Sequence, residues 1–570
     1  MEFTVKGGTP GAVITLNQRW EQDVLYLDIC MEQPEAAIPQ EFSVGWTMPI
    51  RQITSVWSSL GGAERQFRPQ WAPNVTESRL ASGMPLHTLI GADGTNRLTA
   101  ALSDAATPAA ITTGVVEETA CLECFVRLFT MPTTPIRSYK TTLRLDERPV
   151  DWCNAVQAAA DWWRQACGYT PAPVPEHARL PMNSLWYSFH QRLEADAIVE
   201  QCRLSKPLGM DTVIIDDGWQ TLDSNRGYAY CGDWQPERLP DMRGLTEAIH
   251  AEGMKVMLWY SVPFVGIHSK KYREFRDMML DGAYSNGGAF ALDPRYKPVR
   301  EYLTEIYAKA VADWDLDGLK LDFIDAFRLC GRSLEPDDRR DIASLEEAVD
   351  TLMQGVTDAL RAIKPDILIE FRQSYVGPAI RKYGNMLRVG DCPNDPVVNR
   401  RNSIDLRLTS GGTAVHSDML MWHKEDTPEN VARQLAAVLY AVPQISVLLD
   451  TLPQSHKAVL RHYLDFWRQY RSVLLDGYLW ARHPESAYSQ IGAEKDGTAV
   501  VTLWTDPVVE YTGGSLVAVN AGIHGAAVLK NAAGRRLRVV DCTGAEVCTA
   551  AVEEALVLCE VPVGGMLFVE

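Results

Sequence analysis

The strongest constraint on the fold is a repeated pattern in the middle of the chain. Short apolar runs end in a polar or charged residue and alternate with amphipathic helical stretches. Eight such runs lie between about residues 180 and 470, which is the spacing of eight βα units. The predicted strands are 185–190, 212–217, 255–260, 318–323, 367–372, 386–391, 413–418 and 445–450. The pattern predicts a closed (β/α)8 TIM barrel.

The regions on either side of the barrel have a different texture. Short alternating stretches such as 24–29 and 141–145, broken by Gly, Pro, Asn and Asp, are typical of antiparallel strands. Similar short strands return after Trp480, and the proline-rich segment 171–175 marks the first boundary. The predicted domains are an N-terminal antiparallel β-sandwich (1–173), the catalytic barrel (174–474) and a small C-terminal β-sandwich (475–570).

The composition limits the classes of binding partner and the cellular compartment that we expect for this protein. The 73 acidic and 55 basic residues give a net charge of -18, which argues against nucleic-acid and membrane partners. The sequence has neither a signal-peptide pattern nor an apolar run of the roughly 18 residues that a membrane helix needs, so we expect a cytoplasmic protein. Among 12 cysteines, the one close pair, Cys121 and Cys124, lacks the partners of a zinc site. We expect no metal and no cofactor.

The strand 318–322 carries the first candidate catalytic residue. Lys320 and Asp322 are two residues apart and therefore share one face of the strand, which we expect to point into the barrel mouth. A neighbouring ammonium would keep Asp322 ionised, as attack on an anomeric carbon requires. Asp322 is the predicted nucleophile, and a structural ion pair is the alternative.

Asp391 ends a later strand, and Asp395 follows closely. Two crowded carboxyl groups cannot both ionise easily, so one pKa rises and that group becomes a proton donor. We therefore expect Asp391 to be the general acid and base. Asp395 is either its substitute or the cap of a helix that begins at Pro396. Arg388 either binds a sugar hydroxyl or orients Asp391.

A third strand end carries a pair of carboxylates. Asp216 and Asp217 suit the hydroxyls of a sugar, and the C–H face of a pyranose packs well on an indole. Trp234 and Trp259 are the predicted platforms. In the alternative interpretation, the paired aspartates bind a divalent cation together with His190.

Several segments resemble glycoside hydrolase family 36. These are VIIDDGWQ (213–220), DGLKLDF (317–323) and RVGD (388–391), which look like the raffinose-synthase and seed-imbibition branch, and AVHSDMLMW (414–422), which is similar to a segment found across the clan and carries Asp418. The resemblance implies α-galactosidase-like activity with Asp322 as nucleophile and Asp391 as acid and base. It also implies sugar contacts from Asp216, Asp217, Trp234, Lys320 and Arg388.

One segment departs from that family. Where many bacterial members have Cys-Ser-Ser-Gly-Gly, which reads the second position of the sugar, this chain has EFRQSY over residues 370–375. Arg372 and Gln373 are therefore candidates to read a hydroxyl, an acidic substituent or another sugar. In the alternative interpretation, Arg372 is a buried partner of Glu370.

Together these residues predict a retaining exo-α-glycosidase that releases terminal α-linked galactose or a related sugar by double displacement. The two carboxyl groups would then lie roughly 5 to 6 Å apart. The alternatives are an α-galactosyl transglycosylase that uses a sugar hydroxyl as acceptor, a non-catalytic carbohydrate-binding barrel, and a metal-dependent hydrolase. The expected partner is an oligosaccharide or glycoside, and the sequence leaves open whether the chain forms a homo-oligomer.

Overall fold

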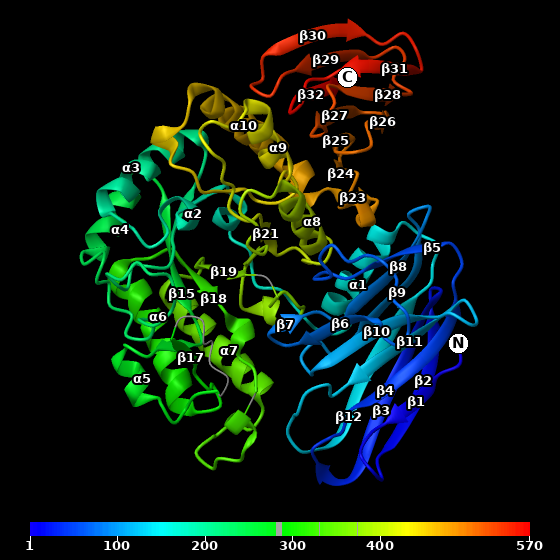
Figure 1. The fold of residues 1–570 in the computed structure, drawn as a ribbon, viewed down its shortest axis with the longest axis vertical. Helices are drawn as coiled ribbons and strands as arrows, with labels where there is room; N and C mark the ends of the chain where they lie inside the picture. Colours follow the sequence, from blue (N-terminus) through cyan, green and yellow to red (C-terminus); the bar gives the residue numbers. More distant parts are fainter. Residues whose placement is uncertain (281–287, 330, 373) are drawn as a thin grey trace.

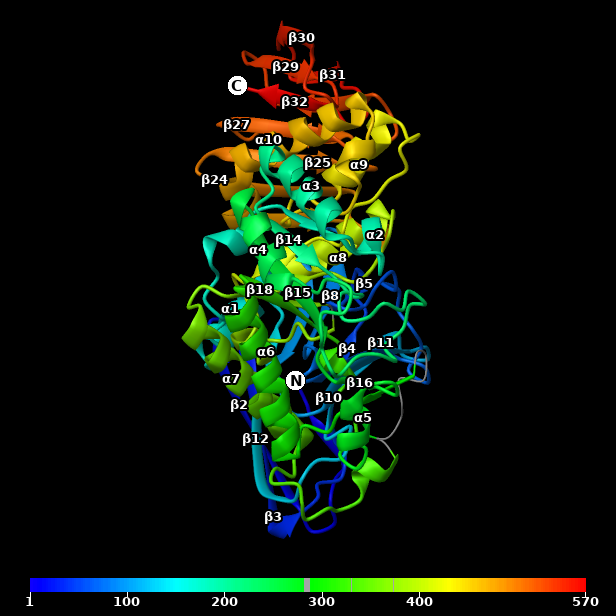
Figure 2. The same cartoon turned by 90° about the vertical axis from the view of Figure 1, so that its left-hand side faces the viewer.

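Three regions follow one another along the chain in the computed structural model, which describes residues 1–280, 288–329, 331–372 and 374–570. Figure 1 shows the N-terminal strands beside the barrel, and the C-terminal strands beyond helices α9 (Pro428–Ala436) and α10 (Gln454–Asp476). Turned by 90°, the molecule is elongated and carries the C-terminal strands at one end (Figure 2). Among the described residues, no helix combines the length and hydropathy required of a membrane span.

The N-terminal region consists of two six-stranded sheets with antiparallel pairing. Apolar side chains alternate along the strands, as Leu25, Leu27 and Ile29 do, and those of the two sheets form one shared core. The strands are β1 (Thr4–Gly7), β2 (Val13–Glu21), β3 (Val24–Ala37), β4 (Phe42–Pro49), β5 (Ile53–Trp57), β6 (Asn74–Arg79), β7 (Ser82–Gly83), β8 (Leu86–Gly91), β9 (Asn96–Leu102), β10 (Ala109–Val116), β11 (Cys121–Leu128) and β12 (Ile136–Asp146). This architecture agrees with the predicted antiparallel region.

The central region is an eight-stranded parallel sheet in the order β21-β20-β19-β18-β15-β14-β13-β22. Isolated parallel bridges from His416 to Val442 and from Leu420 to Ile445 link its two edges, so the barrel is nearly closed. The strands are β13 (Met182–Ser184), β14 (Thr212–Ile215), β15 (Lys255–Ser261), β18 (Gly318–Asp322), β19 (Leu368–Arg372), β20 (Met386–Arg388), β21 (Ala414–His416) and β22 (Gln444–Ile445). The predicted barrel is confirmed at this level.

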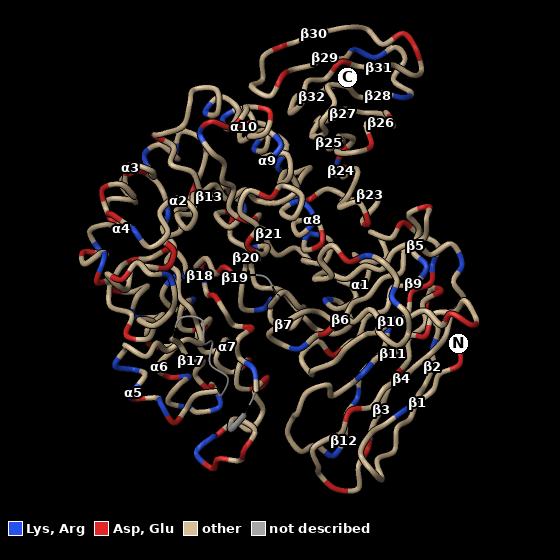
Figure 3. The backbone as a smooth tube through the Cα atoms, viewed as in Figure 1, with Lys and Arg blue, Asp and Glu red and all other residues tan. Residues whose placement is uncertain are grey.

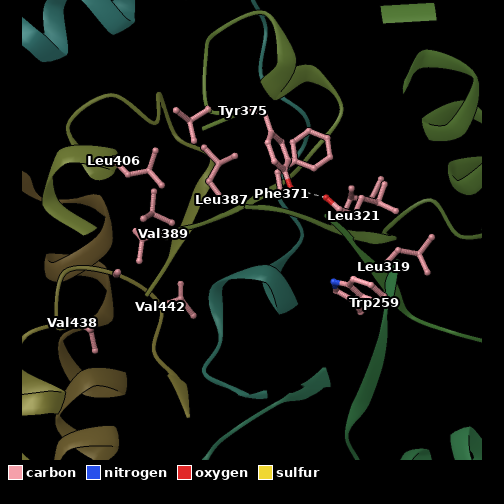
Figure 4. Packing of buried hydrophobic residues seen from close by; sticks show 14 of the residues in the cluster. Trp259, Leu319, Leu321, Phe371, Tyr375, Leu387, Val389, Leu406, Val438 and Val442 are labelled. Atoms are coloured by element: carbon pink, nitrogen blue, oxygen red, sulfur yellow. Dashed lines mark hydrogen bonds between the residues drawn. The ribbon is translucent and has the colours of Figure 1, made fainter. Parts of the chain in front are cut away.

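Helices cover the outside of the barrel. They are α3 (Ala195–Ser205), α4 (Met242–Ala251), α6 (Lys297–Trp314), α7 (Leu345–Ile363), α8 (Pro396–Arg407) and α9. The short helix α2 (Trp186–Phe189) follows β13 at the carboxyl ends of the strands, while β16 (Phe264–Gly266), α5 (Lys270–Glu274) and β17 (Ala289–Ala291) form an excursion after β15. The outward-facing side chains of the strands, such as Leu319, Leu321 and Leu387, belong to the apolar cluster that joins sheet and helices (Figure 4). Tyr375 closes part of this layer by donating a hydrogen bond of 2.8 Å to the carbonyl of Leu321.

Two of the predicted strands are wrong in position. The apolar run 185–190 is not the first strand, because Trp186–Phe189 forms the short helix α2 and the strand β13 lies just before it. The last strand, β22, covers only Gln444–Ile445, and Leu449–Thr451 forms a 3-10 turn. Asp450 is consequently exposed, and it accepts a hydrogen bond of 2.8 Å from Gln201 instead of facing the barrel mouth.

The interior of the barrel changes from apolar to charged along the strands. An apolar layer fills the end where the strands begin, and its members are Ala178, Met182, Ile214, Met257, Leu368, Met386 and Ala414. Side chains two residues further along the same inner faces are Glu370 after Leu368 and Arg388 after Met386. Because active residues of this fold lie at the carboxyl ends of the strands, the layering places the candidate site there.

The C-terminal region contains a seven-stranded sheet and a three-stranded sheet, which share an apolar core. Its strands are β23 (Tyr478–Arg482), β24 (Gln490–Lys495), β25 (Thr498–Leu503), β26 (Val508–Glu510), β27 (Ser515–Asn520), β28 (Ala526–Lys530), β29 (Arg536–Val540), β30 (Glu546–Ala551), β31 (Leu556–Glu560) and β32 (Met566–Val569). Helix α1 (Trp152–Gln165) ties it to the N-terminal sheets, because Trp152 donates to the carbonyl of Ala481 and Trp163 to that of Leu102.

Candidate active site

A pocket with about 310 Å³ of empty space opens at the carboxyl ends of the barrel strands. Figure 3 shows acidic and basic positions interleaved around the barrel rather than gathered on one side. The pocket itself brings charges of both signs together with aromatic walls. Its lining consists of Trp186, Asp216, Asp217, Tyr228, Trp259, Lys320, Asp322, Phe323, Arg372, Arg388 and Asp391. The structure therefore gathers most of the residues that the strand ends predicted.

Asp322 is held firmly at the end of β18. One carboxylate oxygen accepts the indole N–H of Trp259 at 3.0 Å, and the other accepts the backbone N–H of Phe323 at 2.9 Å. Phe323 adopts a φ of 66°, a left-handed conformation that costs energy for a residue with a side chain. This strained turn and the indole fix the direction of the carboxylate toward the pocket.

The cation that contacts Asp322 is not the predicted one. Lys320 lines the pocket, but its ammonium lies 2.6 Å from Asp216. The cation beside Asp322 is Arg372 at the end of β19, whose Nε lies 2.7 Å from a carboxylate oxygen. The sequence placed Lys320 and Asp322 on one face correctly but could not show that Asp216, on the neighbouring strand, is the partner of the lysine.

Asp391 follows β20 and lies between two guanidinium groups. Its carboxylate is 2.9 Å from Arg388 Nη2 and 3.1 Å from Arg372 Nη1. Burial alone would raise its pKa, but Arg388, Arg372 and Lys320 outweigh that effect and lower the pKa to about 2. The prediction that the pKa of Asp391 rises is therefore wrong, because cations rather than carboxylates surround this carboxyl group.

Asp395 does not crowd Asp391. It caps helix α8, where one of its oxygens accepts the backbone N–H groups of Val397 and Val398 at 3.0 Å. Of the two interpretations that the sequence allowed, the structure supports the helix cap. Asp395 is exposed and is not part of the pocket lining.

Arg388 is fully buried and orients Asp391 from behind. It lies 2.6 Å from Asp418, whose other oxygen accepts the backbone N–H of Cys392 at 2.6 Å and the hydroxyl of Tyr187 at 2.9 Å. Burial raises the pKa of Asp418. The predicted sugar contact Asp418 is thus one layer below the pocket, where it holds Arg388 in place.

Asp217 has a different environment from its neighbour Asp216. It accepts hydrogen bonds from the amides of Gln191 at 2.6 Å and Gln220 at 2.7 Å, and burial raises its pKa to about 6. Asp216 instead forms the ion pair with Lys320. The two predicted sugar contacts therefore differ in their partners, which are two amides for Asp217 and an ammonium for Asp216.

The aromatic residues divide into walls and supports. Trp259 lines the pocket as predicted, whereas Trp234 does not and packs against Trp219 and Trp259 at centroid distances of 5.9 and 6.0 Å. Tyr228 is a wall residue that the sequence gave no reason to choose, because it lies in a long irregular connection between β14 and α4. Gln373, the remaining predicted contact, lies outside the described residues.

The metal-site alternative finds no support in this geometry. The described residues contain no group of three or more His, Cys, Asp or Glu side chains placed to hold a metal ion. His190 instead lies 3.0 Å from Arg226 and edge-on to the ring of Trp186.

The N-terminal region reaches the barrel mouth next to these residues. Arg79 donates to the carbonyl oxygens of Asp325 and Phe327 at 2.6 and 2.8 Å, and the N–H of Gly83 donates to the carbonyl of Ser374 at 2.5 Å. The hydroxyl of Ser374 in turn contacts Asp325 at 2.5 Å. The hairpin of β6 and β7 thus fixes the loops that follow Asp322 and Arg372.

Sequence comparisons match part of this chain to known proteins. The Melibiase family model matches residues 177–370. The chain is 29% identical over 198 residues to the A type blood alpha-D-galactosamine galactosaminidase of Flavonifractor plautii, covering 31% of this chain and 17% of that protein. It is 27% identical over 197 residues to the alpha-galactosidase AgaA of Geobacillus stearothermophilus, covering 32% of this chain and 26% of that protein.

Solved structures extend the likeness to the whole chain. The alpha-galactosidase from Lactobacillus brevis superposes with a TM-score of 0.64 at 13% identity, over 100% of this chain and 85% of that one. The GH36 alpha-galactosidase AgaA in complex with 1-deoxygalactonojirimycin gives a TM-score of 0.64 at 15% identity, over 98% and 81%. At these identities the likeness shows the fold, which is that of GH36 alpha-galactosidases.

Proposed function

We propose that the chain is a retaining exo-α-glycosidase that hydrolyses terminal α-linked galactose or a closely related sugar. The observation that carries the proposal is the placement of Asp322 and Asp391 on one small pocket, close enough for the single guanidinium of Arg372 to contact both. Paired carboxylates that flank a sugar-binding site are the machinery of retaining glycosidases. The match of residues 177–370 to the Melibiase model favours an α-galactoside as substrate.

Asp322 is the nucleophile in this proposal. It attacks the anomeric carbon and forms a covalent glycosyl-enzyme, in which its former negative charge is lost to the new bond. The indole of Trp259 and the N–H of Phe323 hold the carboxylate before the reaction, so little reorganisation is needed at the moment of attack.

Asp391 is the general acid and base. It protonates the leaving glycosidic oxygen in the first step, and in the second step it takes a proton from the water that releases the sugar. Its side chain is 42% exposed, which suits a group that meets first the aglycone and then water. Arg388 and Asp418 behind it set its direction.

The remaining pocket residues bind the sugar. Asp216 and Asp217 accept hydrogen bonds from hydroxyl groups, and Lys320 donates them. The rings of Trp186, Tyr228 and Trp259 form apolar walls for the C–H faces of a pyranose.

A substrate panel tests the proposal. Nitrophenol release is measured from α- and β-linked galactosides, glucosides and N-acetylgalactosaminides, and the anomer first formed is followed by NMR. We expect turnover of an α-linked sugar with retention of configuration. Release of the inverted anomer contradicts the mechanism. Transfer to an added acceptor sugar in preference to water would instead indicate the transglycosylase, and binding without turnover would indicate a carbohydrate-binding protein.

A further inference from the structure

Arg372 lies in an unusual position for a cation in a site of this kind. It ends β19 on the inner face of the barrel, and its guanidinium reaches Asp322 through Nε at 2.7 Å and Asp391 through Nη1 at 3.1 Å. The plane of the guanidinium packs on the ring of Phe323, with the central carbon 4.7 Å from the ring centroid. Only 14% of the side chain is exposed. One cation therefore occupies the space between the two proposed catalytic carboxylates.

This bridge is incompatible with the first chemical step as it stands. The step requires a proton on Asp391, whereas the bridged carboxylate has a pKa of about 2 and is ionised at neutral pH. For a sugar to react, the guanidinium has to exchange at least its contact with Asp391 for a contact with the substrate.

The chemistry of the guanidinium restricts what can replace the carboxylate. It has five N–H donors and no acceptor, so the new partner must be an acceptor atom of the sugar. A group that touches both the nucleophile and the acid lies beside the anomeric carbon, next to either the ring oxygen or the second carbon. The ring oxygen gains positive charge in the oxocarbenium-like transition state, and a cation there would oppose the reaction. The side of the second carbon is the one that favours catalysis.

We propose that Arg372 is a substrate-displaced latch that selects sugars with an oxygen acceptor on the carbon next to the anomeric centre. The 2-hydroxyl of such a sugar takes over the Nη1 donor from Asp391, which then takes up a proton from solvent water and passes it to the leaving oxygen. The Nε end remains close to Asp322. This inference rests on the proposed glycosidase function and adds a specificity-determining residue to it.

Backbone contacts close to Arg372 favour a movement of its side chain without a movement of the main chain. The carbonyl of Ser374 is held by Gly83 of the N-terminal hairpin, and the hydroxyl of Ser374 by Asp325. Ser374 is therefore held by the N-terminal region. Rotation of the guanidinium over the ring of Phe323 exchanges its partner without moving the strand.

The charged and titratable groups that face Asp391 come from five elements or their ends. They are Arg388 on β20, Arg372 on β19, Lys320 and Asp322 on β18, Asp418 after β21 and Tyr187 on α2. Removal of the Arg372 charge leaves Arg388 and Lys320 in place. The pKa of Asp391 should then rise without reaching that of an isolated carboxyl group.

The test compares a nitrophenyl α-glycoside with its 2-deoxy analogue in the wild type, in Arg372→Met and in Arg372→Lys. Methionine keeps an unbranched chain on Phe323 but has no donor, and lysine keeps the charge but cannot contact both carboxylates at once. The preference of each protein for the 2-hydroxyl is kcat for the glycoside divided by kcat for its 2-deoxy analogue. Dividing the preference of each variant by that of the wild type cancels the difference in intrinsic reactivity between the two substrates. Arg203→Met, which removes an exposed arginine of α3, is the matched control.

We expect the preference for the 2-hydroxyl in kcat to fall about tenfold or more in both Arg372 variants, the loss expected of a hydrogen bond to a charged group, and to stay unchanged in Arg203→Met. The alkaline limb of the kcat/KM profile should also move to higher pH in Arg372→Met. An unchanged preference and an unchanged alkaline limb, in variants that turn over the substrate, would overturn the latch alone. Absence of turnover of every α-glycoside by the wild type would overturn the glycosidase function and the latch with it.

Discussion

Two buried clusters of charge in this molecule look alike in composition and differ in what they can do. The first, which we call the junction cluster, consists of Arg65, Asp405, Trp57 and Tyr488, and it joins the N-terminal region, helix α8 and the C-terminal region. The second, which we call the mouth cluster, consists of Asp322, Arg372, Arg388 and Asp391 at the strand ends of the barrel. Both contain arginine and aspartate side chains at ion-pair distance.

The clusters differ in their access to open space and in the balance between burial and cations at the carboxyl group. In the junction cluster, one oxygen of Asp405 accepts Trp57 at 2.9 Å and also Tyr488, and the other accepts Arg65, so each carboxylate oxygen has a protein partner. Burial outweighs the arginine there and raises the pKa of Asp405. In the mouth cluster the carboxylates face an open pocket, and three cations together outweigh burial at Asp391.

A buried ion pair or a shifted pKa is therefore not enough to identify a functional site. Both clusters have these properties. What separates them is the open space next to the carboxylates of the mouth cluster. We therefore expect changes in the mouth cluster to alter activity and changes in the junction cluster to alter stability.

The largest expected effect is on activity, at the proposed nucleophile. Asp322→Ala should lower kcat by about 10⁴-fold or more, because no other group can form the covalent intermediate. The thermal unfolding midpoint should stay the same or rise, since the change removes a buried carboxylate from a cluster arranged for chemistry. Nitrophenol release and calorimetry on the same preparation measure both. A large loss of stability with little loss of kcat would make the mouth cluster structural.

A smaller loss of activity is expected at the acid and base. Asp391→Ala should lower kcat by about 10² to 10⁴-fold for an oligosaccharide, because the poor leaving group depends on protonation. For a nitrophenyl glycoside the first step needs little help from an acid, and its rate should fall less. Equal losses for the two substrates would argue against Asp391 as the proton donor.

The junction cluster should respond in free energy of unfolding. Removal of one partner, as in Asp405→Ala, leaves Arg65 buried without a counter-ion and should cost about 3 to 5 kcal/mol. The double change Arg65→Met with Asp405→Leu removes both charges and should cost less than either single change. Urea unfolding measures the stability, and kcat per folded molecule should stay within about twofold. A large fall of kcat in the folded fraction of these variants would show that the junction cluster also supports the active site.

The smallest expected effect is a pH dependence of the free energy of unfolding, which arises from Asp217 in the pocket lining. Burial raises the pKa of Asp217 from its ordinary value of 3.8 to about 6, so the folded state binds this proton more tightly than the unfolded chain. The resulting stabilisation is complete below about pH 4 and is lost as the pH rises to about 6, a difference of about 1 to 3 kcal/mol. Urea unfolding between pH 4 and 7 should show this fall in the wild type and not in Asp217→Asn. Parallel curves for the two proteins would contradict the assignment.

The sequence revealed the mouth cluster better than the junction cluster, and the reason is physical. Asp322 and Arg372 each end a short strand and Asp391 closely follows another. The carboxyl ends of parallel strands meet at one end of a barrel. Arg65 and Asp405 are 340 positions apart and come from different regions, so no local pattern links them. Only the docking of the three regions brings them together.

Within the site, the sequence predicted which side chains meet but not how they pair. Lys320 pairs with Asp216 instead of Asp322, and Arg372 takes the position beside Asp322. These pairings depend on the stagger of neighbouring strands rather than on the sequence of one strand. Trp234 is a support rather than a wall, and Tyr228 was missed, because both lie in an irregular connection whose path follows from packing. The first strand was misplaced because its apolar run suits a buried helical turn equally well.

The central claim is that Asp322 forms the covalent bond to the sugar, and rescue of Asp322→Ala by azide tests it most directly. With an α-linked nitrophenyl substrate, azide occupies the space of the missing carboxylate and attacks from the same side. The account predicts that azide restores nitrophenol release and that the product is the β-glycosyl azide, with Arg203→Met unaffected by azide. An α-glycosyl azide, or no rescue by azide in a folded variant of an active wild type, would contradict the role of Asp322 as the nucleophile.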